Sequence, residues 1–295
     1  MSTAPLNAWI LDALEATRVE RIERVQSLWG GYGEVVRLRV EGGDHEGTVI
    51  LKDVQPPPES RQQGERSHAR KCRSYDVELQ FYRAWASRCD DACRVPRLYS
   101  SRAGATSWTL LLEDLDAAGY HATSSQLDTA QRDGCLSWLA QFHATFAGIR
   151  PDGLWKTGTY WHLATRPDEL ARIQDPALVE AAPQLDAALA NARYLTFVHG
   201  DAKPDNFAFK DGRAAAVDFQ YVGGGCGMKD VAYLLHGERA SDETRALDTY
   251  FTLLRPAVAQ RASAHIDVDA LEAEWRALYP VAKRDFERFL AGWRG

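Results

Sequence analysis

The feature that most constrains this chain is the polar segment HGDAKPDN at residues 199–206, followed shortly by AAAVDFQ at residues 214–220. Asn206 and Asp218 lie twelve residues apart, with a turn-forming Asp211-Gly212 pair between two short apolar runs. A hairpin of this length returns both side chains to the same end of neighbouring strands, where they can share one hard cation. Asp201, five residues before Asn206, can orient a hydroxyl group beside that cation or accept its proton. Phosphoryl transfer needs this arrangement, because its catalysis is mostly positioning and charge neutralisation.

At these residues the chain resembles the protein-kinase-like superfamily, and specifically its small-molecule branch of aminoglycoside phosphotransferases, choline kinases and ecdysteroid-kinase-like proteins. That branch carries HGD with an Asn five residues after the Asp, and then VDF with Gln, where protein kinases usually carry HRD and DFG. The resemblance implies that Asp201 is the catalytic Asp and that Asn206 and Asp218 hold Mg²⁺. It also implies that Lys203 offsets charge on the phosphate transferred from ATP. The alternative interpretation of the segment is a pair of polar turns between strands.

A glycine-containing turn lies between two strand-like runs near the N-terminus. It comprises Gly30, Gly31, Tyr32 and Gly33. Backbone N–H groups can approach phosphate oxygens closely where no side chain intervenes, so this turn is a candidate phosphate-covering loop. It is not a complete GxGxxG pattern, and a simple hairpin turn is the alternative.

A lysine and a glutamate in the same part of the chain are candidates for a buried ion pair. Lys52 ends a β-branched run, and Glu78 lies within the apolar arc formed by Val77, Phe81 and Trp85 on a helix expected over residues 74–88. A carboxylate in that arc needs a partner if it is buried, and Lys52 is the nearest apolar-flanked cation. The resemblance implies the same pair, with Lys52 reaching the α- and β-phosphates of ATP. The alternative for Lys52 is an exposed residue on an edge strand.

The segment around Glu113 and Leu115 follows an apolar run at the end of the strand-rich part. The resemblance implies that the main chain of these two residues holds the adenine ring. The alternative is simply an acidic end to a strand.

The sequence after Asp218 favours a small-molecule acceptor. Residues 223–230 follow almost at once and leave no room for a long protein-kinase activation loop. Asp230 is expected either to brace the catalytic loop or to act as an ordinary helix N-cap, and His143 to make a hydrogen bond in the core. An aromatic segment at residues 154–167 is expected mainly to pack in the core; its other interpretation, carried by Tyr160, Trp161 and His162, is an acceptor-binding wall.

The order of elements predicts an α+β, two-lobed protein-kinase-like fold. Residues 1–115 are expected to form a nucleotide-binding lobe with a leading helix, an antiparallel sheet and one prominent helix, and residues 59–73 a polar surface loop. Residues 116–295 are expected to form a larger, mainly helical catalytic and acceptor-binding lobe. Its predicted elements are helices at 127–146, 186–192, 230–235, 243–254 and 268–293, with a strand-like island at 195–218.

Composition excludes several classes of partner. The net charge of -6 leaves no basic footprint for nucleic acid or an anionic membrane, and no apolar run is long enough to span a bilayer. The five cysteines are few and odd in number, and no charged-then-apolar leader precedes them, so a cytoplasmic location is expected.

Together these features predict an ATP- and Mg²⁺-dependent kinase that phosphorylates a hydroxyl group of a small molecule. One alternative is a catalytically silent ATP-binding module, although all the central residues are present. The other is a protein kinase, which HGD in place of HRD disfavours. The acceptor stays open among amino alcohols, aminoglycosides, sugars and sterol-like alcohols, as do ATP against GTP and the oligomeric state.

Overall fold

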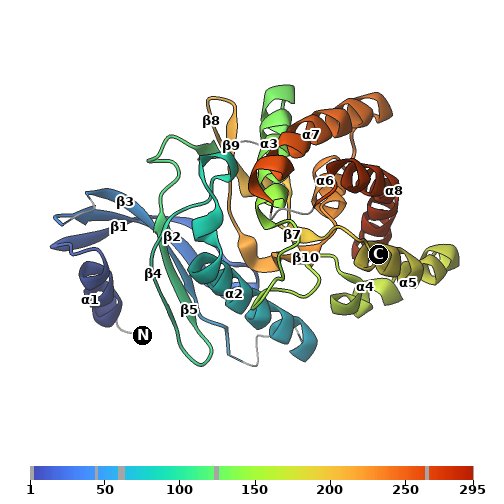
Figure 1. Ribbon diagram of the computed structural model, residues 1–295. Coiled ribbons are helices and arrows are strands. Elements are labelled where there is room, and N and C mark those ends of the chain that lie inside the picture. The colour runs from blue at the N-terminus through green and yellow to red at the C-terminus, as the bar shows by residue number, and fades with distance from the viewer. Residues whose placement is uncertain (1–2, 44–45, 59–63, 123–125, 263–265, 295) are drawn as a thin grey trace. The chain divides into compact units, whose positions relative to one another are not determined.

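The structure is a computed structural model that describes residues 3–43, 46–58, 64–122, 126–262 and 266–294 (Figure 1). The chain divides into two compact units. The N-terminal unit combines residues 1–86 with 95–121, and the C-terminal unit combines residues 87–94 with 122–295. An antiparallel sheet dominates the first unit and helices dominate the second, which confirms the predicted α+β class.

The N-terminal unit is built on a five-stranded antiparallel sheet in the order β1-β2-β3-β5-β4. Alternating apolar residues of β2 and β3, including Val36, Leu38 and Val49, pack with Ile10 of the leading helix α1 and with Leu14, just after its end. Strand periodicity therefore gives this sheet one apolar face that α1 helps to bury. The elements are α1 (Thr3–Ala13), β1 (Arg18–Ser27), β2 (Gly33–Glu41), β3 (Gly47–Val54), β4 (Leu98–Ala103) and β5 (Trp108–Glu113).

Helix α2 (Glu65–Ala84) begins earlier than the sequence suggested. The expectation of a surface loop was wrong for residues 65–73, while residues 59–63 of that segment lie outside the described residues. The first half of α2 has no apolar stripe because it packs through polar residues. His68 faces Tyr32, and its Nδ1 lies 2.7 Å from the tyrosine hydroxyl. Polar packing of this kind leaves no apolar period to read.

The helical C-terminal unit is organised around α3, whose buried face includes Trp138, Phe142 and Phe146. A capping box between Asp128 and Gln131 fixes the start of α3. The expected helices are all present, although α5 begins ten residues before its predicted start. The helices are α3 (Thr129–Phe146), α4 (Pro167–Ala171), α5 (Pro176–Ala190), α6 (Met228–Leu234), α7 (Ala240–Arg261) and α8 (Val268–Trp293).

Short strands in the C-terminal unit carry the segment singled out in the sequence. β7 (Thr196–Val198) pairs with β10 (Gly223–Gly225), and β8 (Phe207–Lys210) pairs with β9 (Arg213–Ala216), all antiparallel. Asp211 and Gly212 join β8 to β9 with φ of 48° and 75°. Two consecutive positive φ values are typical of a tight hairpin turn, so the predicted hairpin is confirmed. The remaining strand is β6 (His121–Ala122), at the point in the sequence where the N-terminal unit ends and the C-terminal unit resumes.

Within the described ranges, no helix is both long and apolar enough to cross a membrane.

A glycine near the end of α8 sets how closely this helix packs on α4. A Cβ added at Gly292 would lie 1.9 Å from the carbonyl oxygen of Glu169 and 3.2 Å from Ile173. We predict that Gly292→Ala lowers stability by about 1–3 kcal/mol through overpacking, despite the better helix propensity of alanine. The thermal unfolding midpoint measures this, with the exposed Glu287→Ala on the same helix as control. An unchanged midpoint for Gly292→Ala would contradict the packing described here.

Candidate active site

The loop after β7 carries Asp201, the predicted catalytic residue, in a buried position. Gly200 precedes it with φ of 84°, and a Cβ there would lie 2.2 Å from the carbonyl oxygen of Tyr221. Only glycine satisfies both the left-handed conformation and the close approach. A 3-10 turn at Pro204–Asn206 then leads into β8. The chain therefore presents Asp201 and Asn206 on one short, sterically defined loop.

The side chain of Asp230 holds this loop in place from α6. Its Oδ2 accepts the backbone N–H of His199 at 2.6 Å, and its Oδ1 accepts that of Gly200 at 2.9 Å. His143 Nε2 lies 3.1 Å from Oδ2, and His143 Nδ1 lies 2.7 Å from the Tyr250 hydroxyl. Of the two expectations for Asp230, the brace is confirmed, and so is the core hydrogen bond of His143.

His199 links the loop to the hairpin, a role that the sequence analysis did not assign. Its Nε2 lies 3.0 Å from the carbonyl oxygen of Val217, and its Nδ1 lies 3.3 Å from the backbone nitrogen of Asp201. Both bonds form only if Nε2 carries the proton and Nδ1 accepts. The ring also packs on Phe219, with centroids 4.8 Å apart. Nothing in the spacing of the sequence signals this double contact.

Asn206 and Asp218 flank the open end of the β8–β9 hairpin, where the backbone of Val217 donates to the carbonyl of Asn206 at 3.0 Å. Asn206 Nδ2 donates to the carbonyl and the carboxylate of Asp201 at 2.8 and 3.0 Å. These bonds fix the amide orientation, so Oδ1 is the end that can act as a ligand. Asp218 adopts a left-handed conformation and accepts from Gln220 Nε2 at 2.7 Å.

The surroundings of Asp201 shift the pKa of its carboxyl group in opposite directions. Burial raises the pKa of Asp201, the Lys203 ammonium lowers it, and the Asp218 carboxylate raises it again. Lys203 Nζ lies 3.6 Å from Asp201 Oδ2. Tyr233 on α6 was not predicted as part of the site; burial and the Asp201 carboxylate raise the pKa of its phenol. The net result is a carboxylate with increased proton affinity.

The donor set fits a metal that is bound chiefly by phosphate. In the part of the chain that the structure describes, no group of three or more His, Cys, Asp or Glu residues could hold a metal ion by itself. Mg²⁺ in phosphate-binding sites takes only one or two protein ligands and completes its shell with phosphate oxygens and water. The Asn206 amide oxygen and the Asp218 carboxylate suit that requirement.

The N-terminal unit contains the predicted ion pair. Lys52 Nζ on β3 lies 2.8 Å from Glu78 Oε1 and 2.7 Å from Oε2 on α2. Both side chains are less than 10% exposed, at 8% and 2%. Such a pair persists in a low-dielectric setting only because each charge compensates the other. The sheet and the helix are thereby fixed to each other at one point.

The glycines of the turn at residues 29–33 differ in what surrounds them. Gly30, Gly31 and Gly33 all have positive φ, at 73°, 77° and 133°. A Cβ at Gly33 would lie 2.1 Å from the carbonyl oxygen of Asp53, so packing against β3 already accounts for this glycine. At Gly31, by contrast, no atom of the described chain other than those of Gly31 and its two chain neighbours lies within 4 Å of an added Cβ. Gly31 is therefore the position whose surroundings leave room for a ligand.

The segment from Glu113 to Leu115 continues from β5, and its backbone is partly used. Glu113 N–H donates to the carbonyl of Arg97 at 2.9 Å, and the carbonyl of Leu115 accepts from Tyr120 N–H at 2.8 Å. These two groups are therefore already used, whereas the Leu115 N–H donates to no residue in the described part of the chain and can donate to a ligand.

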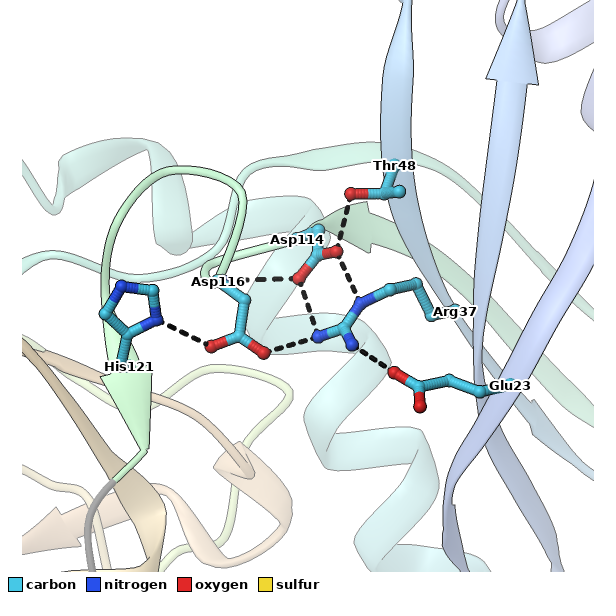
Figure 2. Close-up of polar contacts among 6 residues, drawn as sticks. All are labelled: Glu23, Arg37, Thr48, Asp114, Asp116 and His121. Atoms are coloured by element: carbon cyan, nitrogen blue, oxygen red, sulfur yellow. Dashed lines mark hydrogen bonds and ion pairs between the residues drawn. The ribbon is translucent and has the colours of Figure 1, made fainter.

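Figure 2 shows what holds this segment. The buried carboxylate of Asp114 accepts Arg37 Nε at 2.6 Å, Arg37 Nη2 at 3.2 Å and Thr48 Oγ1 at 2.7 Å. The Arg37 guanidinium also pairs with Glu23 and Asp116. The Asp114 carboxylate raises the pKa of Arg37 beyond its usual range. Strands β2 and β3 thus fix the chain between Glu113 and Leu115 through side chains that sequence analysis did not connect.

Most of the aromatic segment is structural. Trp161 is fully buried against Phe286 and Phe289 of α8, which confirms core packing for this residue. His162 Nε2 lies 3.4 Å from Asp186. Tyr160 and His162 are both only partly buried, in contrast to Trp161.

The chain is similar to known proteins in sequence and in fold. A family model described as the phosphotransferase enzyme family matches residues 24–278. A choline kinase from Cryptosporidium parvum Iowa II is similar in fold, with a TM-score of 0.61 and 10% identity over 99% of this chain and 89% of the other. An amicoumacin kinase in complex with AMP-PNP, Ca²⁺ and Ami gives a TM-score of 0.56 and 12% identity over 99% and 86%. A microcompartment-associated aminopropanol kinase gives 0.52 and 14% over 98% and 94%. No curated protein sequence matches the chain.

The buried ion pair yields a stability prediction. Removing one partner leaves the other charge uncompensated, so Lys52→Met should cost about 3–5 kcal/mol, and adding Glu78→Leu should recover most of that loss. A double-mutant cycle by urea unfolding measures the coupling, which we expect to exceed about 2 kcal/mol. The exposed pair Arg18–Glu41, at 3.3 Å, is the control and should couple by less than about 1 kcal/mol. Equal coupling in the two pairs would contradict this account.

Proposed function

Because the chain belongs to the phosphotransferase enzyme family, we propose that it transfers the γ-phosphate of ATP to a hydroxyl group of a small molecule, with Mg²⁺ as the metal. Family membership confirms the resemblance to the small-molecule branch of the protein-kinase-like superfamily and the prediction of a phosphotransferase enzyme. The observation that carries the proposal is the juxtaposition in the C-terminal unit of buried Asp201 with Asn206, which shares the open end of the hairpin with Asp218.

In the proposed reaction Asp201 orients the acceptor hydroxyl and receives its proton. The hydroxyl oxygen forms a bond to the γ-phosphorus while the bond from that phosphorus to the β,γ-bridging oxygen breaks, which releases ADP. The raised pKa of Asp201 favours proton acceptance. Lys203, 3.6 Å from that carboxylate, is a neighbouring cation that can offset charge on the transferred group. Held by Asn206 and Asp218, Mg²⁺ would supply further neutralisation of the phosphate oxygens.

The N-terminal unit is proposed to bind the same ATP molecule. Lys52, fixed by Glu78, is assigned to the α- and β-phosphates, and the turn with Gly30, Gly31 and Gly33 to the phosphate backbone. Open space at Gly31 supports this assignment more than Gly33 does, since Gly33 is needed for packing. The main chain of Glu113 and Leu115 is assigned to adenine, with the Leu115 N–H as donor. Support for the last assignment is the side-chain network that immobilises this segment.

The acceptor is proposed to be a small hydroxyl compound rather than a protein. After Asp218 the chain passes through a 3-10 turn, β10 and α6 by residue 234, with no long loop for a protein substrate. The names of the similar structures, which refer to choline, amicoumacin and aminopropanol, make amino alcohols a natural first group to test. The alternative of a silent ATP-binding module has no observation in its favour, because none of the central side chains is replaced.

The test is Mg²⁺-dependent ADP release over a panel of amino alcohols, aminoglycosides, sugars and sterol-like alcohols. We expect at least one acceptor to stimulate turnover, and Asp201→Asn to lower kcat by about 10²–10⁴-fold because the proton acceptor is lost. Affinity for ATP, measured by calorimetry, should change little in this variant. ATP binding without turnover on any acceptor would favour the silent module, and full activity of Asp201→Asn would contradict the mechanism.

A further inference from the structure

A lysine that the proposed reaction has not used lies against the glycine-containing turn. Lys71 Nζ on α2 lies 4.3 Å from the centroid of the Trp29 ring and 4.4 Å from that of Tyr32. A Cβ added at Gly30 would approach this nitrogen to 2.7 Å. The ammonium group is therefore in direct contact with the turn, at the position where Gly30 has no side chain.

Among the residues that the structure describes, this ammonium group has no hydrogen-bond acceptor. Its nitrogen is buried and forms no hydrogen bond to any residue in the described ranges. Contact with two aromatic rings compensates part of the lost hydration, but a charged donor without an acceptor still carries an energetic cost. Burial lowers the pKa of Lys71, and the neighbouring charge of Arg70 lowers it further. An anion at this position would relieve both effects.

The turn and the helix are held in register by other contacts. His68, Lys71, Tyr75 and Glu78 follow one another at intervals of three or four residues, so they share one face of α2. On that face His68 bonds the Tyr32 hydroxyl at 2.7 Å, and the rings of Tyr75 and Tyr32 lie 6.2 Å apart. Lys71 thus contacts the turn from the same face of α2 that carries Glu78.

Position along α2 relates Lys71 to the Lys52–Glu78 pair. Lys71 lies seven residues before Glu78, which is about two turns, or roughly 10 Å along the helix axis. A triphosphate is an extended chain of anionic groups. If Lys52 contacts the α- and β-phosphates, a second cation is needed for the phosphate at the far end. Lys71, next to the glycine turn and on the helix face that carries Glu78, suits that phosphate.

We propose that Lys71 binds the terminal phosphate of ATP, exchanging the rings of Trp29 and Tyr32 for a phosphate oxygen. This inference rests on the proposed function, since it takes the nucleotide as given. A charge-assisted hydrogen bond to phosphate is stronger than a contact with an aromatic ring, so the exchange favours the triphosphate. Open space at Gly31 lets a phosphate group approach the turn beside the ammonium. Lys71 then distinguishes ATP from ADP before any chemistry occurs.

The test compares binding of AMP-PNP and ADP, each with Mg²⁺, by calorimetry on the full chain. We expect Lys71→Met to weaken AMP-PNP binding by about tenfold, which corresponds to one charge-assisted bond partly offset by the ring contacts that it replaces. ADP binding should weaken by less than about twofold. Lys71→Arg should retain most of the preference for AMP-PNP. Arg66→Met is the matched control, because it removes one positive charge from an exposed position on the same helix.

Equal losses for AMP-PNP and ADP in Lys71→Met would overturn the proposal, because they would make Lys71 a structural link between α2 and the turn. No loss for either nucleotide would overturn it as well. If the wild-type chain binds neither nucleotide, the proposed function itself fails; binding with an unchanged preference in Lys71→Met defeats the Lys71 assignment alone.

A second measurement uses the unaltered lysine and so does not depend on folding of the Lys71 variants. Trp29 is 66% exposed, and its ring contacts the ammonium. Withdrawal of Lys71 should change Trp29 emission when AMP-PNP is added, and not when ADP is added. The Trp29 signal is the difference between wild type and Trp29→Phe, which keeps an aromatic ring. The same response to both nucleotides would overturn the proposal.

Discussion

The carboxylate of Asp230 is the constraint on which the C-terminal site depends. It accepts the two consecutive backbone N–H groups that precede Asp201, and it contacts His143 in the last turn of α3. Each of these buried donors would cost about 1–3 kcal/mol if left unsatisfied. The loop therefore has one favoured conformation, and Asn206 adds to it by donating twice to Asp201. The position of the proposed proton acceptor is set by the core rather than by the loop itself.

Helix α2 has the corresponding role in the N-terminal unit. One face of it fixes Lys52 through Glu78, holds the glycine-containing turn through Tyr32, and places Lys71 against that turn. Figure 2 shows a second set of contacts in this unit, in which Arg37 of β2 binds Asp114 just after the end of β5. Each candidate nucleotide contact in this unit is thus attached to a rigid element, which limits the entropy lost when a ligand is ordered.

Local patterns predicted the parts of the site that depend on local geometry. The Asp211-Gly212 turn fixed the hairpin, and with it the proximity of Asn206 and Asp218; the apolar arc of α2 located Glu78, and with it the pair to Lys52. Links between distant residues could not be read in this way. Arg37 on β2 and Asp114 just after β5 are 77 positions apart in the sequence. They meet because only one strand, β3, lies between β2 and β5 in the sheet. The early start of α2 was missed for a related reason, since its first turns pack through polar contacts.

The central claim is that the open end of the β8–β9 hairpin holds the metal of a metal–nucleotide complex. The most direct test is electron paramagnetic resonance of Mn²⁺, whose free-ion signal falls on binding, with AMP-PNP and the full chain. We expect nucleotide-dependent Mn²⁺ binding that weakens about tenfold or more in Asp218→Asn, since a charged ligand is lost. Asp211→Asn, at the far end of the same hairpin, should bind as wild type does. Equal Mn²⁺ binding by the Asp218 and Asp211 variants would contradict the claim.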